Sequence, residues 1–460
     1  MAKKTKTVFV CQECGYESPK WLGQCICGAW NSMVEEKVTL DTSKDVRSRS
    51  AGKAVNPYKL KEVTSGNYSR TESGIKELDR VLGGGIVKGS LILISGEPGI
   101  GKSTLILQAS NNIASKDGVV LYVSGEESEE QIKMRADRVC KELSENVLIL
   151  PETNLENIEA VCEKVSPKFL VIDSIQTMYS EAMDSAPGSD TQVRMCANLL
   201  MKLAKTKNIP VFVVAHVTKS GELAGPKTIE HLVDCVLHFT GERDQDLRIL
   251  RSFKNRFGTT NEIGAFTMQG GGLVQIENLS GSLLEASDNP VEGSVATAIY
   301  EGSRAVLFEI QALVASGNPG FAKRTSIGVD YQRVSMLLAV LEKRAGLNLS
   351  AKDVYVNVVG GLKPDSTSVD LAVVLAIYSS AKGVAPDEKT LVIGEVDLTG
   401  EVRMVQNSEK IVSEAARLGY KKIILPKKNA EKVAKDEKLR KEGCQIVGVP
   451  NIYQAIKEYE

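Results

Sequence analysis

The stretch Gly96-Glu97-Pro98-Gly99-Ile100-Gly101-Lys102-Ser103 decides the fold of the first large domain, because it matches the pattern G-x-x-x-x-G-K-[ST] at every fixed position. The apolar run from Ser90 to Ser95 before it is typical of a buried strand, and the residues from Thr104 onward are typical of a helix. Glycines let successive backbone N–H groups turn toward phosphate oxygens, and the helix start adds a favourable dipole. We therefore predict that Gly96 to Thr104 bind ATP, with Lys102 at the β- and γ-phosphates and the Ser103 hydroxyl on Mg²⁺.

Length and composition limit the class of protein. A chain of 460 residues exceeds one ordinary domain and favours about three. No run of 18 apolar residues is present, and no apolar segment of signal-peptide length follows the basic start Met1–Lys6. We therefore expect a cytoplasmic protein with no membrane partner. The formal net charge of −1 neither supports nor excludes binding of nucleic acid.

Four of the nine cysteines fall within the first 30 residues, which in a cytosolic chain favours a metal site over disulfides. The four are Cys11, Cys14, Cys25 and Cys27. Their thiolates can bind Zn²⁺ tetrahedrally, although one residue separates the second pair instead of two. The alternative is a set of free thiols in a disordered tail. A module this short has no core of its own, so zinc would supply much of its folding free energy. We predict a zinc ribbon-like module at 1–34 and a polar linker at 35–58.

Three further apolar runs are typical of parallel strands that end in polar residues: 119–124, 169–174 and 210–216. Strands that alternate with helical stretches predict a doubly wound α/β sheet, with ligands bound at the carboxyl ends of the strands. Asp173 fits the acid that holds the Mg²⁺ shell. Glu126 is the candidate base for the attacking water, and the adjacent Glu127 stays open as the alternative.

Glu126 follows the strand that comes directly after the P-loop helix, and this placement resembles the RecA-like family of motor ATPases. The resemblance implies an ATPase core, which we place at 59–284. It also implies two DNA-binding loops that face a central channel, matched here by the segments 179–194 and 217–230. His216 falls where that family places a γ-phosphate sensor.

The pentapeptide Lys254-Asn255-Arg256-Phe257-Gly258 is the next notable cluster. Lys254 and Arg256, two residues apart on an extended segment, point the same way and can reach a nucleotide on a neighbouring subunit. From physics alone, an ordinary solvated turn is the simpler interpretation.

With the four-cysteine module and the P-loop, this pentapeptide resembles the RadA (Sms) family of bacterial DNA-repair proteins, over essentially the whole chain. The resemblance implies a hexameric ring that hydrolyses ATP and moves on single-stranded DNA. It also implies branch migration on branched recombination intermediates, together with the RecA recombinase as a partner.

The C-terminal part, which we place at 285–460, resembles the proteolytic domain of Lon protease, an α+β fold of the ribosomal S5 domain 2-like type. Such a protease needs a serine nucleophile and a desolvated lysine. Ser368 falls at the serine position, but the lysine position falls on Ser408 or Glu409. Lys410 is displaced by about one residue and would point roughly 100° away on a helix. We therefore expect no peptidase activity, and a domain kept for ring assembly and DNA contact.

Three functions are compatible with these patterns: a DNA-dependent ATPase that drives branch migration, an ATP-dependent protease of Lon type, and a non-catalytic DNA scaffold. The displaced Lys410 argues against the protease. The complete set of Lys102, Ser103, Glu126 and Asp173 argues against the scaffold.

Overall fold

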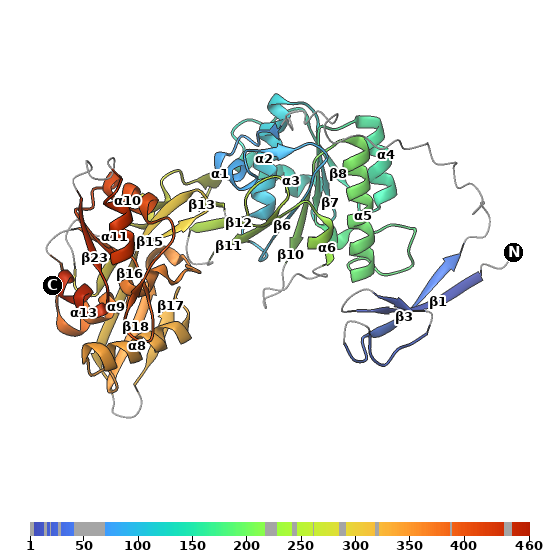
Figure 1. Ribbon diagram of the computed structural model, residues 1–460. Coiled ribbons are helices and arrows are strands. Elements are labelled where there is room, and N and C mark those ends of the chain that lie inside the picture. Colours follow the sequence, from blue (N-terminus) through green and yellow to red (C-terminus); the bar gives the residue numbers. More distant parts are fainter. Residues whose placement is uncertain are drawn as a thin grey trace, which may run out of the picture. The chain divides into compact units, whose positions relative to one another are not determined.

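The computed structural model describes residues 4–12, 16–18, 20–25, 29–40, 70–216, 228–241, 246–260, 262–284, 291–317, 322–386, 389–436 and 444–460. The chain divides into two compact units (Figure 1). The first comprises Met1–Thr240 and Arg248–Gln275, and the second comprises Gly241–Leu247 and Ile276–Glu460. Among the described residues, no helix is both long and apolar enough to cross a membrane.

The N-terminal module is a small antiparallel sheet in the order β2-β1-β3, formed by Glu17–Ser18, Lys4–Cys11 and Met33–Leu40. Strand β3 pairs with β1 from Met33 to Leu40. It therefore extends past residue 34, into the first residues of the segment 35–58 that we expected to be linker. Backbone pairing with β1 orders these polar residues, and their own sequence pattern does not show it.

The core of the first unit is a nine-stranded sheet in the order β14-β13-β12-β11-β6-β10-β9-β7-β8. The strands β6 to β11 pair in parallel, whereas β12 and β14 each run antiparallel to the preceding strand. In chain order from β6 to β14 they are Leu91–Gly96, Val120–Ser124, Val147–Pro151, Phe169–Asp173, Val211–His216, Cys235–Thr240, Leu247–Asn255, Ile263–Gln269 and Gly272–Gln275. The strand runs expected at 90–95, 119–124, 169–174 and 210–216 correspond to β6, β7, β9 and β10.

Helices cover both faces of this sheet. Alternate residues of β6 face opposite sides, so Leu91 and Leu93 lie in one buried cluster while Ile92 and Ile94 lie in another. Burying each such side chain contributes about 1.5–3 kcal/mol. The helices α1 to α6 are Lys76–Val81, Lys102–Lys116, Glu129–Val139, Leu155–Val165, Asp190–Lys207 and Thr228–Leu232. Helices α2 and α3 contribute to the Ile92 cluster, and α4 and α5 contribute to the Leu91 cluster.

The second unit is built on a seven-stranded mixed sheet in the order β17-β18-β16-β15-β19-β22-β23. In chain order these strands are Ser294–Glu301 (β15), Arg304–Ser316 (β16), Arg324–Ile327 (β17), Lys352–Val358 (β18), Thr390–Val392 (β19), Lys422–Pro426 (β22) and Gln445–Val449 (β23). A separate hairpin pairs β20 (Glu395–Val396) with β21 (Val402–Arg403).

The helices of the second unit are Leu279–Leu283 (α7), Tyr331–Ala345 (α8), Asp370–Lys382 (α9), Ser408–Arg417 (α10), Lys427–Val433 (α11) and Ile452–Tyr459 (α13). Residues 370–379 of α9 are all buried, which makes α9 the central helix of the unit. The short helix α7 belongs here, because the Leu307 amide donates a hydrogen bond to the Ser280 hydroxyl at 3.0 Å. The continuous part of the unit therefore starts at Ile276, whereas we expected residue 285.

Candidate functional site

The P-loop joins β6 to α2 in a conformation that only glycine tolerates. Gly96 has φ +154°, and a Cβ there would lie 2.5 Å from the Phe239 carbonyl oxygen. Gly101 has φ +112°, and a Cβ there would lie 2.8 Å from a Met268 side-chain carbon. Both positions therefore exclude side chains and keep the backbone N–H groups of the loop accessible to a phosphate.

Lys102 begins α2 and lies under this loop with 3% of its surface exposed. Its ammonium donates hydrogen bonds to the Gly96 and Glu97 carbonyl oxygens at 2.8 and 2.9 Å. Burial lowers the pKa of Lys102 to about 8, against the opposing effect of the Asp173, Glu126 and Glu97 carboxylates. A phosphate group in the loop would stabilise the charged ammonium, so the site fits an anion.

Four adjacent strands end at the same edge as the P-loop. His216 of β10 pairs with Gly96 of β6, and Asp173 of β9 pairs with Ser124 of β7. Because these strands are parallel, their carboxyl ends bring Asp173, Glu126 and His216 beside the P-loop. This is the edge at which the sequence predicted the nucleotide.

Asp173 is buried, and its Oδ2 accepts a hydrogen bond from the Tyr122 hydroxyl at 2.5 Å. Burial, more than the neighbouring carboxylate, raises the pKa of Tyr122 well above its ordinary value, so this hydroxyl stays a donor. A carboxylate at the end of β9, with one oxygen held by a tyrosine, and the Ser103 hydroxyl at the start of α2 are suitable donors for the Mg²⁺ shell. The sequence did not single out Tyr122, because an aromatic residue inside a strand is ordinary.

The two neighbouring glutamates point to different partners. Glu126 accepts a short hydrogen bond from the Ser174 hydroxyl, and its other oxygen lies 3.6 Å from His216 Nε2. Glu127 forms an ion pair with Arg135 of α3. The geometry therefore favours Glu126 as the group that faces a nucleotide, and Glu127 as a structural residue.

The pentapeptide lies at the opposite edge of the sheet from the P-loop. Asn255 of β12 pairs with Cys235 at the start of β11, and Cys235 pairs with Ile92 at the start of β6. Gly96 lies five residues after Leu91 along β6, which is about 16 Å along a strand. Lys254 and Arg256 are therefore not assembled with Lys102 and Asp173 within one chain.

Each charged residue of the pentapeptide has a local partner. The Lys254 ammonium donates to the Glu230 and His231 carbonyl oxygens at 2.7 and 3.1 Å. Burial lowers the pKa of Lys254, and the Arg256 guanidinium lowers it further. Arg256 forms an ion pair with Asp234 at 3.3 Å and keeps 54% of its side chain exposed. Asp234, the partner of Arg256, has no motif around it and was not predictable from the sequence.

The zinc ligands are only partly within the described residues. Cys11 and Cys25 are buried in one cluster with Met33, whereas Cys14 and Cys27 lie outside the described residues. Two buried cysteines from separate segments of a small ribbon fit a tetrahedral thiolate site. The loop 179–194 is described, but residues 217–227 of the second expected DNA loop are not.

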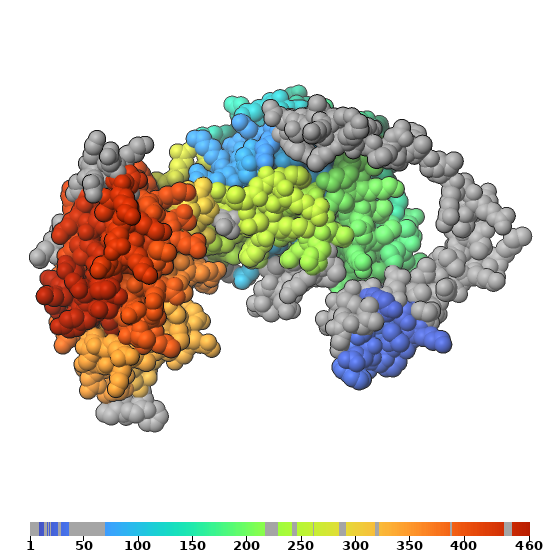
Figure 2. Space-filling view, in the orientation of Figure 1, coloured from blue at the N-terminus to red at the C-terminus, as the bar shows by residue number. Residues whose placement is uncertain are grey.

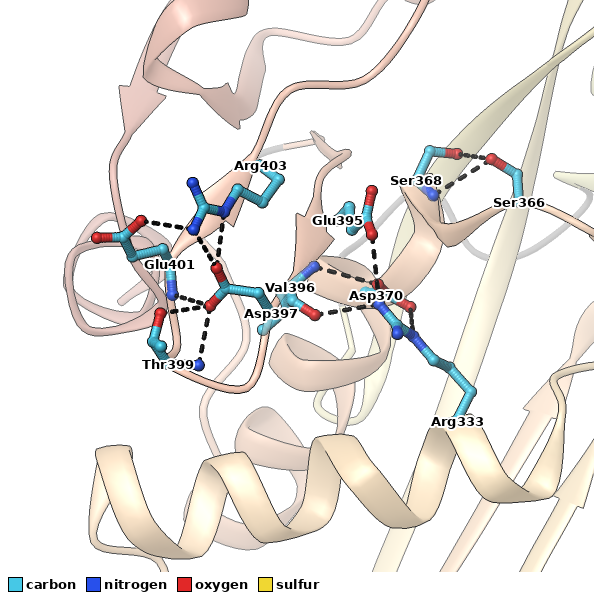
Figure 3. A network of polar contacts seen from close by, with 10 residues as sticks. All are labelled: Arg333, Ser366, Ser368, Asp370, Glu395, Val396, Asp397, Thr399, Glu401 and Arg403. Carbon is cyan, nitrogen blue, oxygen red and sulfur yellow. Dashed lines mark hydrogen bonds and ion pairs between the residues drawn. The ribbon is translucent and has the colours of Figure 1, made fainter.

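In the second unit, Ser368 is buried, and its hydroxyl accepts a hydrogen bond from Ser366 Oγ at 2.9 Å (Figure 3). At the expected lysine position, the Ser408 hydroxyl accepts a hydrogen bond from the buried Asn429 amide at 2.8 Å. Lys410 instead donates to the Tyr300 hydroxyl at 2.5 Å and lies over that ring. These contacts give no support to a serine–lysine dyad.

A network of ion pairs stabilises the region around Ser368. Arg333 of α8 makes a bidentate contact with Asp370 of α9 and donates to the Val396 carbonyl oxygen at 3.1 Å (Figure 3). Burial raises the pKa of Asp397, but hydrogen bonds from the Arg403 side chain and from Thr399 and Glu401 outweigh it and lower the pKa to about 2. These contacts join α8, α9 and the hairpin β20–β21, so they account for the architecture of the unit.

Comparison with protein families gives three matches. Residues 9–35 match the "Rubredoxin metal binding domain", residues 55–222 match the "AAA domain", and residues 319–429 match "Subunit ChlI of Mg-chelatase". The expected fold class is confirmed: a zinc ribbon, an AAA/RecA-like P-loop core and a Lon-like C-terminal domain.

Among curated proteins, the chain is 47% identical to "DNA repair protein RadA" of Bacillus subtilis (strain 168) over 99% of this chain and 98% of that protein. It is 49% identical to "DNA repair protein RadA" of Streptococcus pyogenes serotype M6 over 99% of each chain. The protein of the same name from Listeria monocytogenes serovar 1/2a is 47% identical over 100% of this chain and 99% of its own. Among solved structures, "KaiC-like protein PH0186" of Pyrococcus horikoshii OT3 aligns with a TM-score of 0.38 and 19% identity, covering 45% of this chain and 98% of its own.

Proposed function

The chain belongs to the RadA family of DNA repair proteins, and on that basis we propose that it is a DNA-dependent ATPase that moves on single-stranded DNA. In this proposal it promotes branch migration of recombination intermediates, as a homo-oligomeric ring and with RecA as its partner. ATP and Mg²⁺ bind at the P-loop, and Zn²⁺ binds at the N-terminal ribbon. The observation that best supports the ATPase is the set of polar groups that the ends of β6, β7, β9 and β10 bring to one edge.

Each group at that edge has a role in the proposed hydrolysis. The backbone N–H groups of residues 96–104 and the Lys102 ammonium hold the phosphates. Ser103 and Asp173 hold the Mg²⁺ shell, and the metal would neutralise charge on the phosphate oxygens. Glu126 accepts the proton of the attacking water. His216, 3.6 Å from Glu126, links the end of β10 to that carboxylate.

In this proposal, the positive charges of Arg256 and Lys254 reach the nucleotide from a neighbouring copy of the chain. Arg256 is bonded through Asp234 to the start of β6, about one strand length or roughly 16 Å from the P-loop of its own chain, and the Lys254 ammonium is held by carbonyl oxygens of α6. Both cations therefore contact a nucleotide only if a second copy presents its P-loop edge to them. An arginine supplied in this way stabilises transition-state charge and is worth about 10³- to 10⁵-fold in kcat.

Steady-state ATP hydrolysis with and without single-stranded DNA tests the proposal. Zinc-loaded wild-type protein is compared with Lys254→Ala and with Lys207→Ala, a matched control at a surface ion pair with Glu163. We expect strong stimulation by DNA that only Lys254→Ala loses. Equal rates with and without DNA would refute the motor and leave an ATPase with another partner.

A further inference from the structure

Asp234 is a buried carboxylate at the amino edge of the sheet, with 2% of its side chain exposed. Two cations from different elements contact it. Lys205 of α5 lies 2.8 Å from its Oδ2, and Arg256 lies 3.3 Å from its Oδ1. Both cations are about half exposed, at 48% and 54% of their side chains. The carboxylate thus lies below two charged groups that reach the surface.

Asp234 is also bonded to the start of the strand that leads into the P-loop. Its amide donates to the Leu91 carbonyl oxygen at 2.9 Å, and its Oδ2 accepts from the Leu91 amide at 3.1 Å. Its carbonyl oxygen accepts from the Arg256 amide at 3.0 Å. Arg256 is therefore fixed to Asp234 through both its backbone and its side chain, and Asp234 is fixed to β6.

Residues 228–240 and 248–255 (yellow-green in Figure 2) form part of the surface of the first unit. Phe257 and Asn255 do not contribute charge there. The Phe257 carbonyl oxygen accepts from Arg70 at 2.6 Å, and the Asn255 amide donates to the Val81 carbonyl oxygen at 3.3 Å. These contacts hold the backbone of the pentapeptide, while Asp234 determines where the Arg256 guanidinium lies.

We infer that Asp234 is the positioning residue that aims Arg256 at the nucleotide bound by a second copy of this chain, with Lys205 balancing its charge. The inference rests on the proposed function, because it requires Arg256 to act across a subunit boundary. Asp234 does not touch the nucleotide. It connects the Arg256 of one subunit to the strand that ends in the same subunit's P-loop.

Asp234→Asn tests this inference, because it keeps the size of the side chain and an oxygen for the Leu91 amide but removes the charge. A misplaced catalytic group costs about 10- to 100-fold, so we expect kcat with single-stranded DNA to fall by that factor. The affinity for ATP should change less than about twofold, since Asp234 lies at the opposite edge from the P-loop of its own chain. Lys207→Ala, two residues along the same helix from Lys205, should leave kcat unchanged. Unchanged kcat in Asp234→Asn would overturn the inference.

Rings that mix two kinds of variant subunit show whether Asp234 acts on the nucleotide of a neighbouring subunit or only within its own subunit. Lys102→Ala subunits have no competent P-loop but keep Asp234 and Arg256, so they can serve an Asp234→Asn neighbour. In an equal random mixture, about a quarter of all sites combine an intact P-loop with an intact neighbouring Arg256, and activity should recover to about a quarter of wild type. An equal mixture of Lys102→Ala and Arg256→Ala subunits is the reference.

Recovery in both mixtures supports the inference. Recovery with Arg256→Ala but not with Asp234→Asn would overturn it and leave the proposed function intact. Recovery in neither would overturn the cross-subunit role of Arg256, and the inference with it.

If Asp234→Asn does not assemble, Lys205→Met is measured instead, because the unbalanced carboxylate should draw Arg256 inward and lower kcat. An unchanged kcat in Lys205→Met would then overturn the inference.

Discussion

Replacing Glu126 with glutamine removes one carboxylate at the P-loop edge of the sheet while keeping the size of the side chain. The Ser174 hydroxyl can still donate to the amide oxygen, so the local structure should survive. The amide cannot accept a proton from water as the carboxylate does. We therefore expect a protein that folds and binds ATP but turns it over slowly.

The expected loss of hydrolysis rate in Glu126→Gln follows from the role of Glu126 as a general base. A positioned general base contributes about 10²- to 10⁴-fold, which corresponds to about 3–5 kcal/mol of transition-state stabilisation. Glu127→Gln is the matched control, since it removes the same charge one residue away. Its partner is Arg135, and 38% of the Glu127 side chain is exposed. Breaking such a partly exposed pair costs at most about 1 kcal/mol of folding stability and should leave turnover within about threefold of wild type.

The assay is single-turnover and steady-state hydrolysis with single-stranded DNA, together with equilibrium binding of a fluorescent ATP analogue. Glu126→Gln should bind the analogue with wild-type affinity and hydrolyse ATP at least a hundredfold more slowly, or about 2.7 kcal/mol in activation free energy. Loss of turnover in Glu127→Gln with retention in Glu126→Gln would refute the reasoning and move the role to Glu127. Loss of analogue binding in Glu126→Gln would show a structural role instead.

Three further predictions concern the metal, the proton and the ribbon. Tyr122→Phe removes the hydroxyl that holds Asp173, so the Mg²⁺ concentration for half-maximal hydrolysis should rise about tenfold. An unchanged Mg²⁺ titration would contradict a role of Tyr122 in the Mg²⁺ site. The pKa of Lys102 is lowered to about 8, and phosphate favours the charged ammonium. ATP binding at pH 8.5 should therefore take up about 0.7 proton, and almost none at pH 6.5, where Lys102 is already charged. Titration calorimetry in buffers of different ionisation enthalpy measures this uptake, and a buffer-independent enthalpy at pH 8.5 would count against it. Cys25→Ser should lower the zinc content and expose the N-terminal module to protease, whereas the half-buried Cys140 can be changed to serine without loss of zinc; equal zinc content in both variants would disprove the ligand assignment.

The sequence predicted the P-loop and the strands around it because those signals are local. The apolar run that ends at Gly96 is a buried strand whatever its neighbours are, and the glycine pattern requires a tight loop. The ribbon strand through Leu40 was not predictable in this way, because its partner β1 determines it.

Tyr122 shows why part of the site could not be found from the sequence. It pairs with Val171 on the neighbouring strand, and Asp173 is two residues further along on the same face. The hydroxyl therefore reaches the carboxylate as a diagonal neighbour. Only the register between β7 and β9 brings the two together, and no spacing within either strand reveals it.

For the pentapeptide, the local sequence and the place in the sheet lead to opposite expectations. Taken alone, Lys254 and Arg256 form a solvated turn with partners for both charges. The antiparallel β12 returns the chain to the amino end of β6, so these cations cannot share a nucleotide with their own Lys102. Two cations at that edge, Lys205 and Arg256, contact the buried Asp234, and they either serve only this carboxylate or serve a second copy as well. A purely structural pair would not need both side chains about half exposed above one carboxylate, and that excess of outward-facing charge favours the second copy.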